Sequence, residues 1–506
     1  MTRLSHRRFS ACRVLAVCSL TLAAGLCACT QSTQGSSSGD PLADVRDAKE
    51  DVRTRVAAVE PARSKASANP ALLGATVQTF KDIAWTPKED PSLRVAVITS
   101  LLNDPDPAIV DNARAMGTLM LPREQDRAVV VLYAQTAADR GWTDYIPPLI
   151  RSFSRPLAAV EDQERSEALA LRTLSGGKPV EEVVFGVFLN PPSLPQSYGL
   201  DWAERFRADA WDLLGRLDRD GQMRVRMLTD APAGSQGDAV VSNMRRALSD
   251  LRAIPLTGAE LTWLGSLADP TKAANAAWWQ QASSAIGGVT DNGPFYLRHA
   301  EPVRWAAANK PVWYNASREQ LLSELSTRLA ERDRVERATG FAVKVRENLA
   351  HYAPRLKWAD VLSMLVLDEL LASPSVRTAL FEQTRLDRND KTTEYGGLLT
   401  FGGEQAGSGR AALYPPRPGQ RNGDQKFVAS DAMIAASDLA LAHYHFHVQE
   451  TLNGKYAGPS DGDLVYAARY GRSCVVFTSL NEDELNADFY QPDGVVIDLG
   501  TIKRAK

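Results

Sequence analysis

Three of the six histidines in this 506-residue sequence, His443, His445 and His447, alternate with aromatic residues near the end of the chain. Alternate side chains of a β-strand project from one face, so this spacing predicts a row of three imidazoles on one side of a strand. Ser460 and Asp463 follow at a spacing that predicts the first turn of a helix. Two imidazoles and one carboxylate on neighbouring elements are a ligand set for catalytic zinc, with the fourth position left to water. The sequence therefore predicts a Zn²⁺ site here.

The same residues also have structural interpretations that need no metal. Ser460 and Asp463 have the spacing of a helix-capping pair, in which serine precedes the helix and an acidic residue follows three positions later. Alternating histidines are also typical of a strand face in contact with solvent. The capping and metal-binding interpretations are compatible, because a cap fixes the position of the carboxylate.

Three motifs in the last part of the chain occur in an order that resembles the JAB/JAMM (MPN-type) metalloproteases. They are the run Glu394-Tyr395-Gly396-Gly397-Leu398-Leu399, the run His445-Phe446-His447 and the run Pro459-Ser460-Asp461-Gly462-Asp463-Leu464. The family pattern is a glutamate near an early strand, an H-x-H strand and an S-x-x-D helix start. The resemblance covers about the last quarter of the chain and implies a JAMM-like metallopeptidase domain.

The resemblance also implies a role for each matching residue. His445, His447 and Asp463 would bind one Zn²⁺, which lowers the pKa of a bound water. Glu394 would accept a proton from this water and pass it to the leaving amine. Ser460 would donate a hydrogen bond to the oxyanion of the tetrahedral intermediate. The implied substrate is an amide bond in a protein or peptide, either a peptide or an isopeptide bond.

This sequence departs from the family pattern in the residues around the histidines. Val448 stands where a proline usually follows the second histidine, and the loop from Val448 to Pro459 is longer than is common. The additional His443 leaves two ligand pairs open, His443 with His445 or His445 with His447. We favour His445 with His447, because that pair lies nearer to Ser460 and keeps the loop closer to the family length.

The elements that must position these residues belong to a predicted α+β domain. From Glu394 onward, short apolar runs alternate with loops rich in glycine and proline. The pattern predicts strands at 398–401, 441–448, 474–478 and 495–499, and helices at 432–441 and 463–470. The long segment 402–425, which is rich in glycine, proline and arginine, is interpreted as an insertion that receives a substrate.

The chain before this domain is predicted to be α-helical. Apolar residues recur at three- and four-residue intervals in the segments 93–103, 109–119, 127–136, 165–174, 206–217, 273–286, 358–371 and 376–386. The run 106–113 opens with Asp-Pro and resembles the start of a HEAT-like repeat, whose units stack into a solenoid. A non-repeating helical domain is the alternative. Residues 317–350 are predicted to form one long charged helix, with Ser317 as its N-cap.

The N-terminus has the features of an exported lipoprotein. A start with four arginines leads into an apolar stretch that ends Leu26-Cys27-Ala28-Cys29. This ending resembles the bacterial lipoprotein box, in which Cys29 would carry the lipid. Residues 31–41 are rich in serine and glycine and are typical of a flexible tether. We therefore expect a lipid-anchored protein of the bacterial cell envelope, facing the periplasm or the outer surface.

The predicted organisation has four parts: a lipoprotein signal peptide at 1–28, a tether at 29–45, a helical repeat-like scaffold at 46–350 and a JAMM-like domain at 351–506. The formal net charge of -3 and the lack of a concentrated basic face argue against nucleic-acid binding. The leading hypothesis is an envelope lipoprotein with a zinc-dependent peptidase or isopeptidase domain. The alternative is a non-catalytic scaffold, whose helical array binds a protein partner and whose last domain is inert or holds a structural metal.

Overall fold

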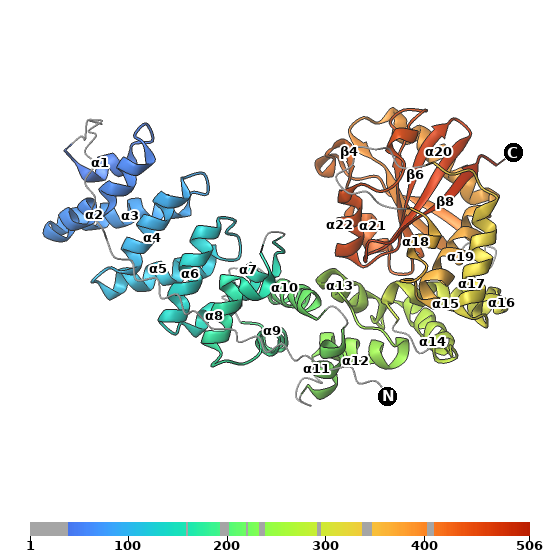
Figure 1. Ribbon diagram of the computed structural model, residues 1–506, viewed down its shortest axis with the longest axis horizontal. Helices are drawn as coiled ribbons and strands as arrows, with labels where there is room; N and C mark the ends of the chain where they lie inside the picture. Colours follow the sequence, from blue (N-terminus) through green and yellow to red (C-terminus); the bar gives the residue numbers. More distant parts are fainter. Residues whose placement is uncertain are drawn as a thin grey trace, which may run out of the picture. The chain divides into compact units, whose positions relative to one another are not determined.

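The computed structural model describes residues 39–157, 160–192, 202–218, 221–231, 238–290, 295–335, 347–401 and 409–505. The chain divides into two compact units, residues 1–105 and residues 106–506, which are described separately (Figure 1). In the described ranges, no helix combines the length and the apolar character needed to cross a bilayer. Cys29 and the rest of the predicted signal peptide lie outside the described residues.

In its described residues, 39–105, the first unit has four helices. They are α1 (Pro41–Arg46), α2 (Val52–Ala68), α3 (Pro70–Trp85) and α4 (Pro91–Leu102). Asp51, Asn69 and Asp90 are the N-caps of α2, α3 and α4, and each side chain accepts a hydrogen bond from the first turn that follows it. Among the described residues, helical structure begins at Pro41, so α1 overlaps the end of the predicted tether of residues 29–45.

The second unit begins with a long run of helices, as the apolar spacing predicted. Its α-helices are α5 (Pro107–Met120), α6 (Arg127–Asp139), α7 (Ile146–Ser154), α8 (Ser166–Leu174), α9 (Val180–Leu189), α10 (Trp202–Leu217), α11 (Gln222–Asp230), α12 (Ala239–Leu251), α13 (Gly258–Leu267), α14 (Ala273–Gly287), α15 (Ala300–Asn309), α16 (Pro311–Tyr314), α17 (Arg318–Ala330), α18 (Leu349–Tyr352), α19 (Trp358–Ala372) and α20 (Pro374–Asn389). Each helical segment predicted before residue 390, apart from 317–350, coincides with one of these helices or with α4. The helical class is confirmed, whereas the HEAT-like repeat stays a prediction.

The predicted single helix over 317–350 is wrong. Ser317 does cap α17 in a reciprocal arrangement with Gln320, but the helix ends at Ala330. The backbone beyond it pairs with the last strand of the chain, because the Asp333 carbonyl accepts a hydrogen bond from the Thr501 amide at 2.9 Å. The Arg332 guanidinium also donates to the Leu499 carbonyl at 2.9 Å. These tertiary hydrogen bonds replace the helical ones that the local sequence favours.

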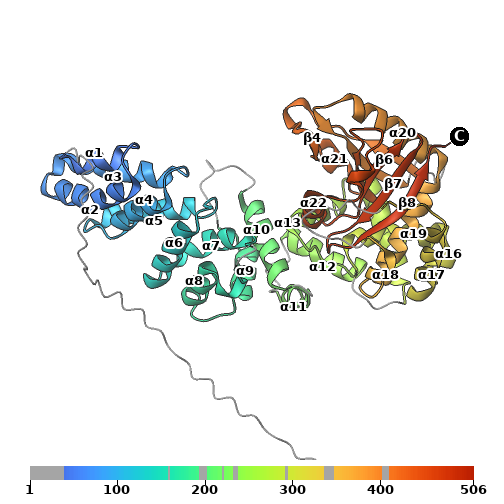
Figure 2. The ribbon, with the colours of Figure 1, turned by 45° about the horizontal axis from the view of Figure 1, so that its top comes forward.

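The end of the second unit is a mixed six-stranded sheet with the order β3-β2-β5-β6-β7-β8 (Figure 2). The strands are β2 (Gly396–Phe401), β3 (Gly409–Leu413), β5 (Ala442–His447), β6 (Cys474–Asn481), β7 (Glu484–Tyr490) and β8 (Val496–Lys503). Neighbouring strands are antiparallel except for β5 and β6, which are parallel. A separate parallel pair joins β1 (Thr393–Glu394) to β4 (Gly423–Phe427). The predicted strands correspond to β2, β5, β6 and β8, while β1, β3, β4 and β7 were not predicted.

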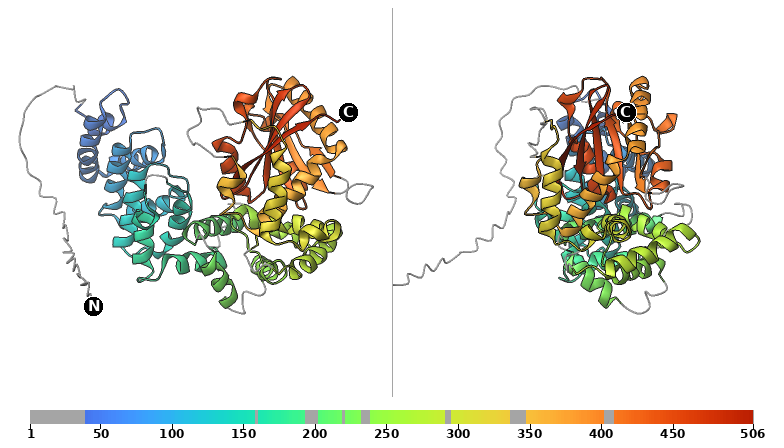
Figure 3. Two further views of the ribbon diagram at one scale, coloured as in Figure 1. Left: turned by 45° about the vertical axis from the view of Figure 1, so that its right-hand side comes forward. Right: turned by 90° about the vertical axis from the view of Figure 1, so that its right-hand side faces the viewer.

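Helices cover both faces of this sheet. On one face, Tyr444 of β5 donates its hydroxyl hydrogen bond to Gln383 of α20. On the other face, α22 (Asp461–Tyr470) packs Ala467 against Cys474 and Val476 of β6. The helix α21 (Asp431–Ala436) is shorter than the predicted 432–441. The residues after it form a turn, in which the Ala440 amide donates to the Ser437 carbonyl at 3.1 Å, and the Leu441 amide then donates to Leu399 of β2 at 2.9 Å. Figure 3 shows the helices of residues 318–372 alongside the strands, and α19 contacts both β3 and β8.

The C-terminal end of α22 packs against the helical part of the same unit. Gly471 ends the helix with a φ of 66°, a left-handed conformation that costs a residue with a side chain about 1–2 kcal/mol. A Cβ atom at this position would also overlap the carboxylate of Glu260, the buried capping residue of α13. Gly494 has a similar φ of 76°, but a Cβ atom there would meet nothing within 4 Å. Of these two glycines, Gly471 therefore combines backbone strain with a steric requirement, whereas Gly494 has the backbone strain alone.

We expect Gly471→Ala to destabilise the protein by about 3 kcal/mol, because overpacking adds to the backbone strain. Gly494→Ala is the matched control and is expected to cost about 1–2 kcal/mol through backbone strain alone. Urea denaturation followed by tryptophan fluorescence measures both losses. Equal losses in the two variants would show that Glu260 moves aside without cost.

Candidate metal centre and its pocket

The histidine strand β5 lies inside the sheet, hydrogen-bonded to β2 on one side and to β6 on the other. His443 and His445 are each 1% exposed and project from the face that α22 covers, whereas Tyr444 projects toward α20. The predicted alternation of faces is therefore confirmed. The strand is apolar or aromatic at its other positions, so burying it on both faces is favourable despite the imidazoles.

The helix α22 begins with the capping pair that the sequence predicted. The Ser460 Oγ accepts a hydrogen bond from the Asp463 amide at 3.3 Å. In return, Asp463 Oδ2 accepts from the Ser460 amide at 2.7 Å and from the Ser460 hydroxyl at 2.8 Å. The cap therefore immobilises the Asp463 carboxylate, which is 7% exposed, on the side of the helix that faces β5.

The carboxylate of Asp463 meets two of the three imidazoles. His445 Nε2 lies 3.2 Å from Asp463 Oδ1, and His447 Nε2 lies 3.7 Å from Asp463 Oδ2. One nitrogen or oxygen atom from each of the three residues lies within 4.8 Å of the others, so the group could hold a metal ion. Ligands at about 2.1 Å from a tetrahedral zinc are separated by about 3.4 Å, which is close to these spacings.

The third imidazole has a different environment. His443 Nδ1 lies 2.7 Å from the hydroxyl of Tyr466 on α22, and His443 is not a member of the candidate metal group. Of the two ligand pairs left open by the sequence, the geometry favours His445 with His447. Burial lowers the pKa of His443 well below its usual value, and the charge of Arg472 lowers it further, so this imidazole is neutral.

The atoms around the two candidate histidine ligands fit a metal ion. The His447 Nδ1–H donates to the Tyr456 carbonyl at 2.9 Å, which places the lone pair on Nε2, the atom nearer to Asp463. His445 Nε2 is buried without a hydrogen-bond partner of acceptable geometry, and such an atom is costly unless something coordinates it. On its other side, His445 Nδ1 lies 3.4 Å from the Tyr490 hydroxyl. The donor set of two imidazoles and one carboxylate is one that zinc accepts.

The three groups also shift one another's pKa values. Burial alone would raise the pKa of Asp463, but the His445 and His447 imidazoles and the hydrogen bonds at the cap bring it below its usual value. Burial alone would lower the pKa of His445, yet the charge of Asp463 outweighs this and raises it. The carboxylate is therefore ionised at neutral pH, which is the form that binds metal.

Glu394 lines the same cavity as Ser460 and Asp463. It ends β1, directly before β2, whose Gly396 pairs with His445. Its side chain is 4% exposed, and its Oε1 accepts a hydrogen bond from Gln449 Nε2 at 2.9 Å. Burial raises the pKa of Glu394 to about 7, although the charge of His445 opposes this shift. A carboxyl group with such a pKa can both accept and return a proton near neutral pH.

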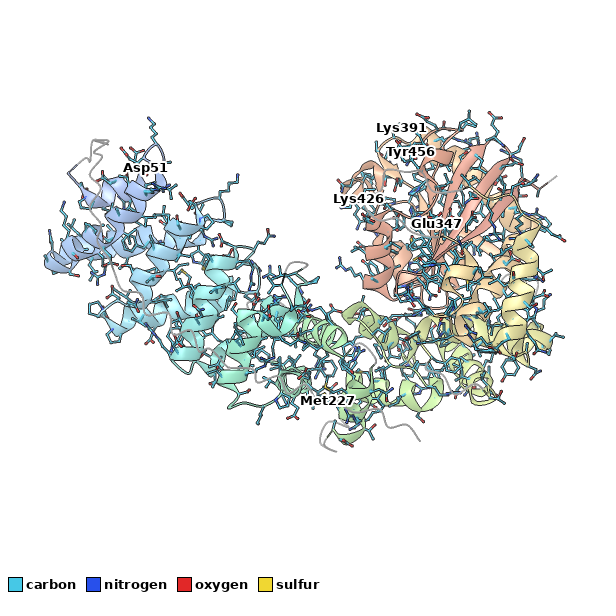
Figure 4. All side chains as sticks on the ribbon, viewed as in Figure 1. Asp51, Met227, Glu347, Lys391, Lys426 and Tyr456 are labelled. Atoms are coloured by element: carbon cyan, nitrogen blue, oxygen red, sulfur yellow. The ribbon has the colours of Figure 1, made fainter. Side chains whose placement is uncertain are left out.

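A cavity of about 560 Å³ opens onto these residues and is lined by Glu394, His447, Ser460 and Asp463. The predicted site residues in the described part of the chain are therefore brought together, with His445 buried directly behind the cavity. Aromatic rings form much of the remaining wall, contributed by Phe427, Tyr456 and Tyr466. Lys426 and Tyr456, both labelled in Figure 4, also line this cavity.

Several residues of the site were not predicted from the sequence. Phe427 stacks on His445, with ring centroids 5.0 Å apart and planes inclined by 18°. Its position depends on the parallel pairing of β1 with β4, which no local sequence pattern predicts. Gln449 and Asn453 lie in the loop after His447, and their only signal was that this loop is longer than the resemblance implied.

A scan against protein-family models and searches of curated proteins and of solved structures found no match to this chain.

Proposed function

We propose that this protein is a zinc-dependent, JAMM-like peptidase or isopeptidase that hydrolyses an amide bond with a metal-activated water. The observation that carries the proposal is the convergence of His445, His447 and Asp463 within 4.8 Å, with Glu394 lining the same cavity as His447 and Asp463. The order and spacing of these residues is also the pattern that resembles the JAMM motifs. Zinc held by the three ligands would supply a water of lowered pKa and a Lewis acid for the substrate carbonyl.

The chain's own residues supply the remaining chemistry. Glu394 accepts a proton as the oxygen of the water forms its bond to the carbonyl carbon of the substrate. It then delivers this proton to the amide nitrogen as the carbon–nitrogen bond breaks, which leaves a carboxylic acid and an amine. The Ser460 hydroxyl, which donates to Asp463 here, must rotate to donate to the oxyanion of the substrate.

The alternative of an inert last domain is less well supported by this site. A purely structural metal site needs four closed ligands, whereas the candidate group has three and faces a cavity of about 560 Å³. Glu394 also lines the same cavity as His447 and Asp463, which a general base requires and a structural metal site does not. The helical part is proposed to bind a protein partner, since it forms a long run of helices before the sheet.

Removal of the metal tests the proposed activity. We expect the zinc-loaded full chain, purified in detergent, to cleave peptides in a library prepared from denatured proteins, with the new termini identified by mass spectrometry. Stripping with a chelator should reduce cleavage to background, and one equivalent of Zn²⁺ should restore it, because the water is activated only by the metal. Cleavage that persists after stripping, or no cleavage with zinc bound, would contradict the proposal.

We further propose that the protein is anchored in the bacterial cell envelope by a lipid on Cys29. The support is the sequence Leu26-Cys27-Ala28-Cys29 after a basic and apolar segment. We expect Cys29→Ser to abolish incorporation of a labelled fatty acid and to release the protein from the membrane fraction. Cys27→Ser is the matched control and should keep the label. Label retained by the Cys29 variant would place the lipid elsewhere or show that there is none.

A further inference from the structure

Two side-chain amides, Gln449 and Asn453, connect the histidine strand to Glu394. Both lie in the loop after β5, where the chain departs from the JAMM pattern through Val448 and through the length of the loop. Asn453 is 1% exposed and Gln449 is half-buried at the wall of the cavity. Their hydrogen bonds form a continuous path from the backbone of a candidate metal ligand to the candidate general base.

The path begins at Asn453, which is fixed at both its backbone and its side chain. Its amide N–H donates to the Ser479 carbonyl of β6 at 2.8 Å. Its Nδ2 donates to the His447 carbonyl at 3.0 Å and to Gln449 Oε1 at 2.8 Å. Asn453 therefore ties the loop to two neighbouring strands and leaves its side chain with one orientation.

The orientation of Asn453 determines that of Gln449. Because Gln449 Oε1 accepts the hydrogen bond from Asn453, its Nε2 must point the other way. This Nε2 donates to Glu394 Oε1 at 2.9 Å and to the Asp424 carbonyl at 3.0 Å. Both N–H groups of the amide are then used, and neither is available to a substrate.

The hydrogen bond from Gln449 fixes the position of the Glu394 carboxylate. Its Oε1 is held by Gln449, so the plane of the carboxyl group is set and Oε2 remains as the oxygen that exchanges a proton with water. A general base is effective only when held within hydrogen-bonding reach of the proton that it accepts, and a loss of positioning of about 1 Å reduces a rate on the order of 100-fold.

We propose that Gln449 and Asn453 are positioning residues that hold Glu394 for proton transfer, a function supplied by the long loop that follows the histidine strand. This inference rests on the proposed peptidase function. It assigns a role to two residues outside the three motifs of the resemblance, and neither of them is placed on the metal or on the substrate.

The test compares the kinetic effect of a substitution at Gln449 in the wild-type protein with its effect in the Glu394→Asp variant. Gln449→Met keeps the length of the side chain and removes its amide. We expect kcat to fall about 10-fold, the size typical of residues that orient a metal-site group, with KM and bound zinc unchanged. In the Glu394→Asp background, where the shorter side chain no longer reaches the amide, the same substitution should change kcat by less than about twofold.

A second variant and a control separate positioning from folding. Asn453→Asp is nearly isosteric but removes the donor to Gln449, and it should lower kcat by a factor similar to that of Gln449→Met. Leu452→Ala changes a side chain of the same loop that is 73% exposed, and it should leave kcat, KM and zinc content unchanged. The inference would be overturned if Gln449→Met lowered kcat equally in the wild type and in Glu394→Asp. It would also be overturned if Gln449→Met lost its zinc or kept the wild-type kcat.

Failure of this inference can be distinguished from failure of the proposed function. If the zinc-loaded wild type cleaves no peptide, the peptidase proposal has failed, and the contact is then measured through thermal unfolding. Gln449→Met and Glu394→Ala should lower the unfolding midpoint less together than the sum of their separate effects, because each removes the same hydrogen bond. Additive shifts would show that Gln449 does not hold Glu394.

Discussion

Asp463→Ala is expected to abolish stoichiometric zinc binding. The wild-type protein should retain about one Zn²⁺ per chain after dialysis, and the variant should bind it on the order of 10²- to 10³-fold more weakly. This expectation follows from the geometry, because Asp463 is the only carboxylate in the candidate group and its oxygens face both imidazoles at 3.2 and 3.7 Å. Losing one of three protein ligands removes a corresponding share of the binding free energy. Metal analysis and competition with a chromophoric chelator measure the effect.

Two further variants show why Asp463→Ala loses zinc binding. Asp463→Asn keeps an oxygen that can accept the capping hydrogen bond from the Ser460 amide, so it separates loss of the ligand charge from loss of the cap. His443→Gln changes the histidine of the same face that is bonded to Tyr466 and should leave zinc binding unchanged. Negligible zinc in the wild type would rule out the site. Zinc lost from His443→Gln but kept by His447→Ala would show that the other histidine pair binds the metal.

The second large effect is expected from Glu394→Gln. The substitution preserves the shape of the side chain but removes the group that accepts the proton, so kcat should fall by a factor of about 10² to 10⁴ while zinc remains bound. The same reasoning gives the pH dependence. Burial holds the pKa of Glu394 near 7 and a bound cation lowers it, so the ionised base is lost as pH falls through this pKa, at or below about 7. In the wild type, kcat should therefore decrease on the acidic side, approaching tenfold per pH unit.

The matched control for this variant is Glu484→Gln, which makes the same change on β7 at a carboxylate paired with Lys503. It should leave kcat unchanged. A Glu394→Gln variant with wild-type kcat would exclude Glu394 as the general base, whereas a variant that loses its zinc would place Glu394 among the ligands. Hydrolysis rates on a cleaved peptide and zinc content, measured on the same preparations, distinguish these results.

The parts of the site that could be predicted are those that depend on short-range pattern. The alternation along β5 and the capping spacing of Ser460 with Asp463 are local rules of strands and helices, and both appear in the structure as predicted. The strand β7 was missed because Asn486 and Asp488 are polar yet fully buried, so its sequence has the composition of a loop. Asn486 donates a hydrogen bond to Asp488 at 2.9 Å and another to Asp498 of the paired strand β8 at 3.2 Å, and the second of these depends on the pairing of the strands.

Other features depend on contacts between distant segments and could not be predicted from local sequence. The helix α17 ends early because the residues after it bond to β8, more than 160 positions later, with Thr501 donating to Asp333. Phe427 stacks on His445 only because β4 pairs with β1. Which two histidines form the candidate metal group also depends on tertiary structure, because Asp463, which faces His445 and His447, lies on a separate helix.

The contact between α13 and the end of α22 affects which segments of this protein can be exchanged by recombination. Arg472, directly after the glycine that ends α22, is 6% exposed and places its guanidinium over the Trp263 ring of α13, 3.3 Å from its centroid. Trp263 in turn donates its indole hydrogen bond to the Asp438 carbonyl at 2.9 Å. A recombination event that moved residues 351–506 into another gene would remove the Trp263 ring from this guanidinium and leave its hydrogen bonds to Ser437. Recombination between genes should therefore keep the coding sequences of the sheet and of its adjoining helices together.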